Sequence, residues 1–169
     1  MPGDLFPAHD HDHDTCTQSL IAHVEKACAQ RGLRLTPLRR EVLFEVAASH
    51  KAIGAYQILE NFAERGKHLA PISVYRCLEF LQKAGFIHHL PSKNSYFACQ
   101  RSFTKTDEGC GVDPLVFLIC SSCGVIGEVD GQGMENLVAD YATARGFQKT
   151  QSQLEINGLC PRCQQTACT

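Results

Sequence analysis

The chain has 169 residues, enough for one medium domain or two small ones, with 16 Lys and Arg against 18 Asp and Glu. No stretch approaches the roughly 20 apolar residues that span a bilayer, and the acidic, histidine-rich N-terminus is unlike a signal peptide; membrane-spanning and secreted classes are excluded and a cytoplasmic protein is expected. Residues 17–99 hold 11 Lys and Arg against 6 Asp and Glu, whereas the remainder is acidic. Unless this charge asymmetry arises by chance, it suggests that one part of the chain binds a polyanion.

The first 99 residues divide into a polar tail and a helix-rich segment. Residues 1–16 are expected to form a disordered tail, because the alternating His and Asp of 9–14 show no apolar period, although such a run could also bind metal weakly. Residues 17–99 contain four helical periods and then two β-prone runs, 86–90 and 96–99. Short helices followed by a hairpin predict a winged helix-turn-helix, whose last helix presents its N-terminal half to the major groove. The expected buried faces are Leu20, Ile21, Val24, Ala27 and Cys28; Val42, Leu43, Val46 and Ala47; Ala55, Ile58, Leu59 and Phe62; and Val74, Cys77, Leu78 and Leu81.

The rest of the chain predicts a hinge and a second domain. Residues 100–114 are polar and lack periodicity, which is typical of a hinge. Residues 115–169 then show strands at 115–119, 125–129 and 147–156 and a helix at 133–145. At 55 residues this domain is small for an independent core. We therefore expect it to need a metal ion and a partner subunit.

Ten cysteines in a reducing compartment are not expected to pair as disulfides, so metal ligation or burial must account for them. Four of them form two CxxC motifs, Cys120-Ser-Ser-Cys123 and Cys160-Pro-Arg-Cys163, separated by 36 residues. Four thiolates at about 2.3 Å in a tetrahedron form a closed structural zinc site; the alternative is four buried or redox-active cysteines. The predicted fold class is α+β: an N-terminal winged helix-turn-helix domain followed by a small α/β dimerisation domain with a four-cysteine zinc site.

The fourth helical segment carries the candidate DNA-reading residues. With its apolar positions in the core, Ser73, Tyr75, Arg76 and Glu79 are expected to face outward. Arg76 can pair bidentately with guanine and Tyr75 can contact a thymine methyl or a phosphate, with Ser73 beside them. Arg34, Thr36 and Arg39, at the start of the second helix, are expected to be phosphate contacts. The alternative for each is an ordinary solvated helix face.

Several motifs together resemble the ferric uptake regulator family, and within it the zinc uptake regulator branch. They are Arg34-Leu-Thr36-Pro37-Leu-Arg39, Val74-Tyr75-Arg76-Cys-Leu, Gly85-Phe-Ile-His88, Asn94-Ser-Tyr96 and the two CxxC motifs, in order from about Leu20 to Cys163. The resemblance implies a homodimer joined through its C-terminal domains, two winged-helix heads on a pseudo-palindromic operator, and zinc-dependent repression of zinc-uptake genes. Repression, as opposed to activation, is inferred from this resemblance.

The resemblance also implies a second, regulatory zinc site near the hinge. In the zinc branch its ligands would correspond to His88, Cys99, Asp113 and Glu128, although the branch usually has His where this chain has Asp113. Cys110 is the alternative third ligand. A thiolate favours zinc over iron or manganese, and more carboxylate in the shell is expected to weaken the site relative to the structural one. Without the resemblance, these side chains would be a surface histidine, a buried cysteine and solvated carboxylates.

Two other classes of protein fit the residues less well than a zinc regulator. An iron or peroxide sensor of the same family would draw on a His-rich segment ahead of the first CxxC motif, and no His follows His89. A zinc deaminase needs H-x-E followed by P-C-x-x-C. His23-Val-Glu25 matches the first part, but Ile119 stands where proline belongs. We therefore expect no enzymatic activity.

Overall fold

The structure, a computed structural model, describes residues 5–6, 13–48, 51–99, 115–148 and 153–166. The chain divides into two compact units. The N-terminal unit is Ala8–Gly111, and the C-terminal unit combines Met1–Pro7 with Val112–Thr169. None of the helices in the described ranges is long and apolar enough to cross a membrane.

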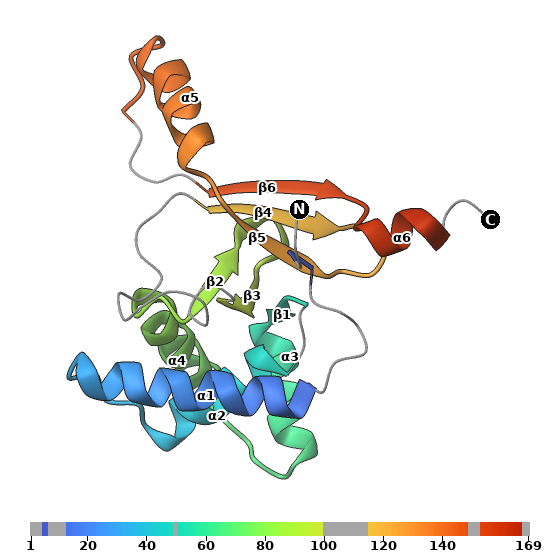
Figure 1. Ribbon diagram of the computed structural model, residues 1–169. Coiled ribbons are helices and arrows are strands. Elements are labelled where there is room, and N and C mark those ends of the chain that lie inside the picture. The colour runs from blue at the N-terminus through green and yellow to red at the C-terminus, as the bar shows by residue number, and fades with distance from the viewer. Residues whose placement is uncertain (1–4, 7–12, 49–50, 100–114, 149–152, 167–169) are drawn as a thin grey trace. The chain divides into compact units, whose positions relative to one another are not determined.

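The N-terminal unit is a winged helix-turn-helix (Figure 1). Its elements are α1 (His13–Gln30), α2 (Pro37–Ala47), β1 (Ile53–Gly54), α3 (Ala55–Glu64), α4 (Pro71–Lys83), β2 (Ile87–Leu90), the short 3-10 helix η1 (Pro91–Lys93) and β3 (Ser95–Ala98). The strands form an antiparallel sheet in the order β1-β3-β2. The α+β class and the winged-helix prediction are thus confirmed.

Local sequence signals explain where these elements begin and turn. The Thr36 hydroxyl accepts a hydrogen bond from the backbone N–H of Arg39 at 3.4 Å and caps α2, which opens with Pro37. Asn94 adopts φ of 44° at the turn between β2 and β3, a left-handed conformation that asparagine tolerates better than most residues. The buried faces predicted for the helices are confirmed, with Ala27 and Leu59 only partly buried.

The N-terminal tail differs from its prediction. Helix α1 begins at His13, inside the segment expected to be disordered. The buried hydroxyl of Thr17 donates to the carbonyl of Ala47 at 3.3 Å and ties this end of α1 to the end of α2. Leu5 and Phe6 are half-buried in the C-terminal unit. Composition alone missed both contacts, because each joins segments far apart in the sequence. Strand β1 was also missed, since two residues carry no periodicity.

The C-terminal unit contains a three-stranded sheet with the order β5-β4-β6. Its elements are β4 (Leu115–Cys120), β5 (Ile126–Asp130), α5 (Gln132–Thr143), β6 (Gln153–Gly158) and α6 (Pro161–Thr166). Strand β4 pairs antiparallel with β5 and parallel with β6. The last strand was predicted at 147–156, but residues 147–148 lie outside any strand. It ends two residues later than predicted, because its parallel pairing follows β4 as far as Cys120 opposite Gly158. Helix α6 was not predicted, and it starts at a proline, a favoured first helical residue.

This unit has few buried apolar side chains of its own. The buried ones in the described residues are Val116, Phe117, Ile119, Cys120, Val125, Ile126 and Cys160. The large apolar side chains Met134, Leu137 and Tyr141 of α5 are exposed, and Figure 1 shows this helix extending beyond the end of the sheet. A unit with such a core needs a further source of stability.

Candidate metal centre and DNA-binding face

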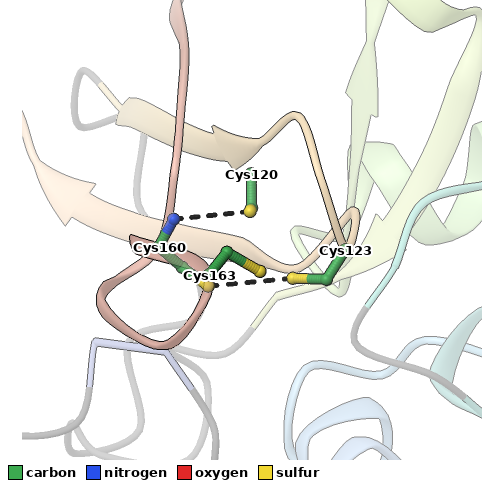
Figure 2. A group of neighbouring side chains, drawn as sticks. All are labelled: Cys120, Cys123, Cys160 and Cys163. Carbon is green, nitrogen blue, oxygen red and sulfur yellow. Dashed lines mark hydrogen bonds between the residues drawn. The ribbon is translucent and has the colours of Figure 1, made fainter. Parts of the chain in front are cut away.

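The parallel pairing of β4 with β6 brings the two CxxC motifs together. Cys120 ends β4 and lies opposite Gly158, so the turn after β4 and the turn after β6 leave the same end of the sheet. Figure 2 shows the four cysteine side chains converging, and their sulfur atoms all lie within 4.8 Å of one another. The Cys123 and Cys160 sulfurs are 3.8 Å apart. A tetrahedron with metal–sulfur bonds of about 2.3 Å has edges of about 3.8 Å, so the geometry fits a single zinc ion.

Backbone groups hold this arrangement and favour a thiolate at Cys120. The N–H of Cys160 points at the Cys120 sulfur at 3.3 Å. Hydrogen bonds from the backbone N–H groups of Cys123 and Cys160 lower the pKa of Cys120 from 9.0 to about 5. Burial raises the pKa of Cys123 to about 12. Gly124 closes the first turn with φ of 77°, which a residue without Cβ adopts readily.

Two of the four predicted regulatory ligands lie together in the N-terminal unit. A ring nitrogen of His88 on β2 and the sulfur of Cys99, the residue just after β3, lie within 4.8 Å of each other. The structure has Cys99 in a disulfide, contrary to the expectation that the cysteines do not pair, and zinc binding requires the reduced thiolate. Glu128 belongs to the C-terminal unit, where it is buried on β5 opposite Phe117. Asp113 and its alternative Cys110 lie outside the described residues.

The exposed face of α4 carries some of the predicted DNA-reading residues. Arg76 is exposed, as expected, and so is Glu79. Ser73 and Tyr75 are half-buried, and Tyr75 packs against the core. Arg76 is therefore the most available base-reading side chain of the predicted set.

The predicted phosphate contacts at the start of α2 are linked to one another. Arg34 is exposed, and its backbone carbonyl accepts a hydrogen bond from the Arg39 guanidinium at 2.5 Å. That guanidinium also stacks 3.5 Å from the centre of the Phe80 ring. Thr36 uses its hydroxyl for the helix cap. Arg39 thus fixes the backbone from which Arg34 projects.

The chain is similar to proteins of one known family, in sequence and in structure. The model of the ferric uptake regulator family matches residues 30–157. The chain belongs to the ferric uptake regulator family. Among its relatives, the zinc uptake regulation protein of Escherichia coli strain K12 is 38% identical over 149 residues, covering 88% of this chain and 84% of the relative. A ferric uptake regulation protein from Synechococcus elongatus is 25% identical, covering 81% of this chain and 90% of the relative.

Solved structures of zinc uptake regulators are also similar to this chain. A zinc uptake regulator complexed with zinc and DNA superposes with a TM-score of 0.77 at 36% identity, covering 90% of this chain and 98% of that structure. The crystal structure of holo XcZur superposes with a TM-score of 0.73 at 37% identity, covering 87% of this chain and 98% of that structure. The resemblance inferred from the sequence motifs, including the zinc branch, is confirmed.

Proposed function

We propose that this chain is a cytoplasmic, zinc-responsive transcriptional repressor that binds operator DNA as a zinc-loaded homodimer and controls zinc-uptake genes. The observation that carries the proposal is the match over 90% of the chain to a zinc uptake regulator in complex with zinc and DNA. The converging cysteines and the exposed Arg76 supply the chemistry that this function needs. An iron- or peroxide-responsive regulator of the same family is the alternative.

Each chain would hold one structural and one regulatory zinc ion. Zinc on Cys120, Cys123, Cys160 and Cys163 would cross-link the ends of β4 and β6. The regulatory ion would be held by His88, Cys99, Asp113 and Glu128. These ligands come from the winged helix, from the predicted hinge of residues 100–114 and from the dimerisation domain of residues 115–169. Zinc binding at this site would favour one arrangement of the two domains. If DNA binds that same arrangement more tightly, zinc raises the DNA affinity, and DNA must raise the zinc affinity by the same factor.

The third regulatory ligand can be assigned by a pair of substitutions. Asp113→Ala is expected to raise the zinc concentration needed for DNA binding, whereas Cys110→Ser is expected to leave it unchanged. The measurement is DNA binding in zinc-buffered solutions, with reductant present to keep Cys99 as a thiol. If Cys110→Ser removes the zinc response and Asp113→Ala keeps it, the third ligand is Cys110.

The exposed apolar side chains of the C-terminal unit support a homodimer. Met134, Leu137 and Tyr141 recur along α5 and are 42%, 58% and 63% exposed. Ile156 on β6 and Leu159 just after it are 45% and 44% exposed. A second copy would cover such a surface by a two-fold symmetric interface, which in turn implies a pseudo-palindromic operator.

Leu137→Glu is expected to convert the dimer to monomers. Burying an unpaired carboxylate in an apolar interface costs several kcal/mol, so the dissociation constant is expected to rise about 100-fold or more. Sedimentation velocity over a concentration series measures the change. Asn136→Glu, which adds the same charge at the neighbouring exposed position of α5, is the matched control and is expected to remain dimeric. A dimer in both variants would place the interface elsewhere.

The metal dependence of DNA binding tests the function as a whole. The reduced protein is treated with a weak chelator and supplied separately with zinc, ferrous iron or manganese. DNA binding is measured with a duplex selected from a random library by the zinc-loaded protein. Zinc is expected to restore binding at lower free concentration than the other ions. Restoration by iron or manganese alone would favour the alternative regulator.

A further inference from the structure

The N-terminal residue Phe6 lies against the cysteine cluster, and Leu5 lies beside it over Gly127. The DNA-binding and zinc-sensing functions require neither contact. Phe6 packs against the group formed by Cys120, Val125 and Cys160, and Cys123 and Cys163 pack against the same group. In Figure 1 this short segment is dark blue and lies beside β5, although some 120 residues separate them in the sequence. An aromatic ring packed on the cysteine group thus comes from the opposite end of the chain.

Gly127 on β5 shows that the sheet has room for this segment. A Cβ atom built on Gly127 would lie 3.0 Å from Leu5 Cγ and 3.0 and 3.2 Å from two ring atoms of Phe6. These are its three nearest contacts. Gly127 does not have positive φ, so its backbone does not require glycine. A glycine inside a strand commonly marks close approach of another segment, and here that segment is Leu5 and Phe6.

We propose that Leu5 and Phe6 form a cover over the four-cysteine site that slows release of the zinc ion held there. Zinc leaves a thiolate site when water, a proton or a competing ligand reaches the sulfurs. An aromatic ring packed on the cysteines restricts that access on one side, and the apolar surroundings also limit solvation of the thiolates. The cover acts on the structural site, so it is independent of which residues sense zinc; it rests on the proposed zinc at the four cysteines.

The first test is the rate of zinc transfer from the full-length, zinc-loaded protein to excess 4-(2-pyridylazo)resorcinol. Phe6→Ala is expected to accelerate release of the tightly held ion about ten-fold, the scale expected when a half-buried phenyl ring loses an apolar contact. Phe44→Ala, which removes a phenyl ring that is 39% exposed in the N-terminal unit, is the matched control and is expected to leave the rate unchanged. Equal rates for wild type and Phe6→Ala would overturn the cover.

The substitution Gly127→Val tests the same contact by changing the residue on the sheet. Valine suits a strand, so without the cover this change should leave zinc retention unchanged or improve it. With the cover, the added side chain displaces Leu5 and Phe6 and should accelerate zinc release. In a chain lacking residues 1–7, Gly127→Val should then have no further effect, because its contact partners are gone. If Gly127→Val accelerates zinc release equally in the full chain and in the chain lacking residues 1–7, the inference is contradicted.

A fluorescent reporter shows docking without reference to metal. The chain has no tryptophan, so Phe6→Trp introduces a single one. Its emission is expected to be blue-shifted and protected from iodide, and Gly127→Val in the same chain should shift it to the red. Fully exposed emission in both chains would overturn the cover. If the wild type holds no zinc while the reporter is protected, the zinc site fails as a proposal and the packing of Phe6 stands alone.

Discussion

Cys160→Ser is expected to remove the tightly bound zinc ion and to unfold the C-terminal unit. The described part of this unit buries few apolar side chains, whereas a structural zinc site contributes about 10–16 kcal/mol of binding free energy to folding at neutral pH. That contribution is as large as the whole free energy of unfolding of a typical domain, about 5–15 kcal/mol. We expect the zinc stoichiometry to fall by one per chain, the thermal transition of this unit to disappear and the dimer to dissociate.

Cys16→Ser is the matched control for this experiment. Cys16 lies in α1, is half-buried and does not belong to the cysteine cluster. The control is expected to keep its zinc, its thermal transition and its dimer. Calorimetry, native mass spectrometry and sedimentation velocity report the three properties. A folded, dimeric Cys160→Ser protein with unchanged zinc content would contradict a structural role for the cysteine cluster.

Arg76→Ala is expected to weaken binding to the selected duplex selectively, with little change in binding to random DNA. A bidentate contact between arginine and guanine contributes about 1–3 kcal/mol of discrimination, or roughly 5- to 150-fold in the ratio of the two affinities. Arg76 is exposed on the α4 face that a winged helix presents to the major groove, and its removal leaves the buried face of α4 intact. Fluorescence anisotropy with both duplexes at one salt concentration measures the ratio.

Arg40→Ala provides the control for charge alone. Arg40 lies on α2 and pairs with Glu25 across the protein surface, with side chains 54% and 48% exposed, so its loss is expected to cost little stability. Its substitution removes the same charge from the same unit and should leave the ratio of affinities unchanged. Equal loss on both duplexes for Arg76→Ala would assign this arginine to the phosphate backbone instead.

Sequence periodicity predicted the N-terminal unit well because each helix buries one continuous apolar face. All four faces are found in the core, and the cap at Thr36 and the turn at Asn94 follow from the preferences of those residue types. Contacts between distant segments leave no periodic signal. The packing of Phe6 on the cysteines and the pairing of β1 with β3 were missed for that reason.

The two candidate metal sites differed in how far the sequence could define them. CxxC spacing fixes two neighbouring thiolates in each motif, and a short domain leaves little freedom to separate the motifs, so the four-cysteine cluster followed from the residues. His88 and Cys99 were selected by family resemblance, and the structure places them near one another, His88 on β2 and Cys99 just after β3. Arg39 shows a further limit. Its charge suggested a phosphate contact, whereas its stacking on Phe80 and its hydrogen bond to Arg34 depend on the folded arrangement.

Native mass spectrometry of the reduced protein, before and after a weak chelator and paired with DNA-binding measurements on the same samples, tests the central claim most directly. The account predicts a dimer with two zinc ions per chain, of which one resists the chelator and one is removed. Loss of the removable ion should abolish binding to the selected duplex, and its return should restore it. A single tightly held zinc ion per chain, with DNA binding unaffected by the chelator, would contradict zinc sensing and leave a zinc-stabilised DNA-binding dimer.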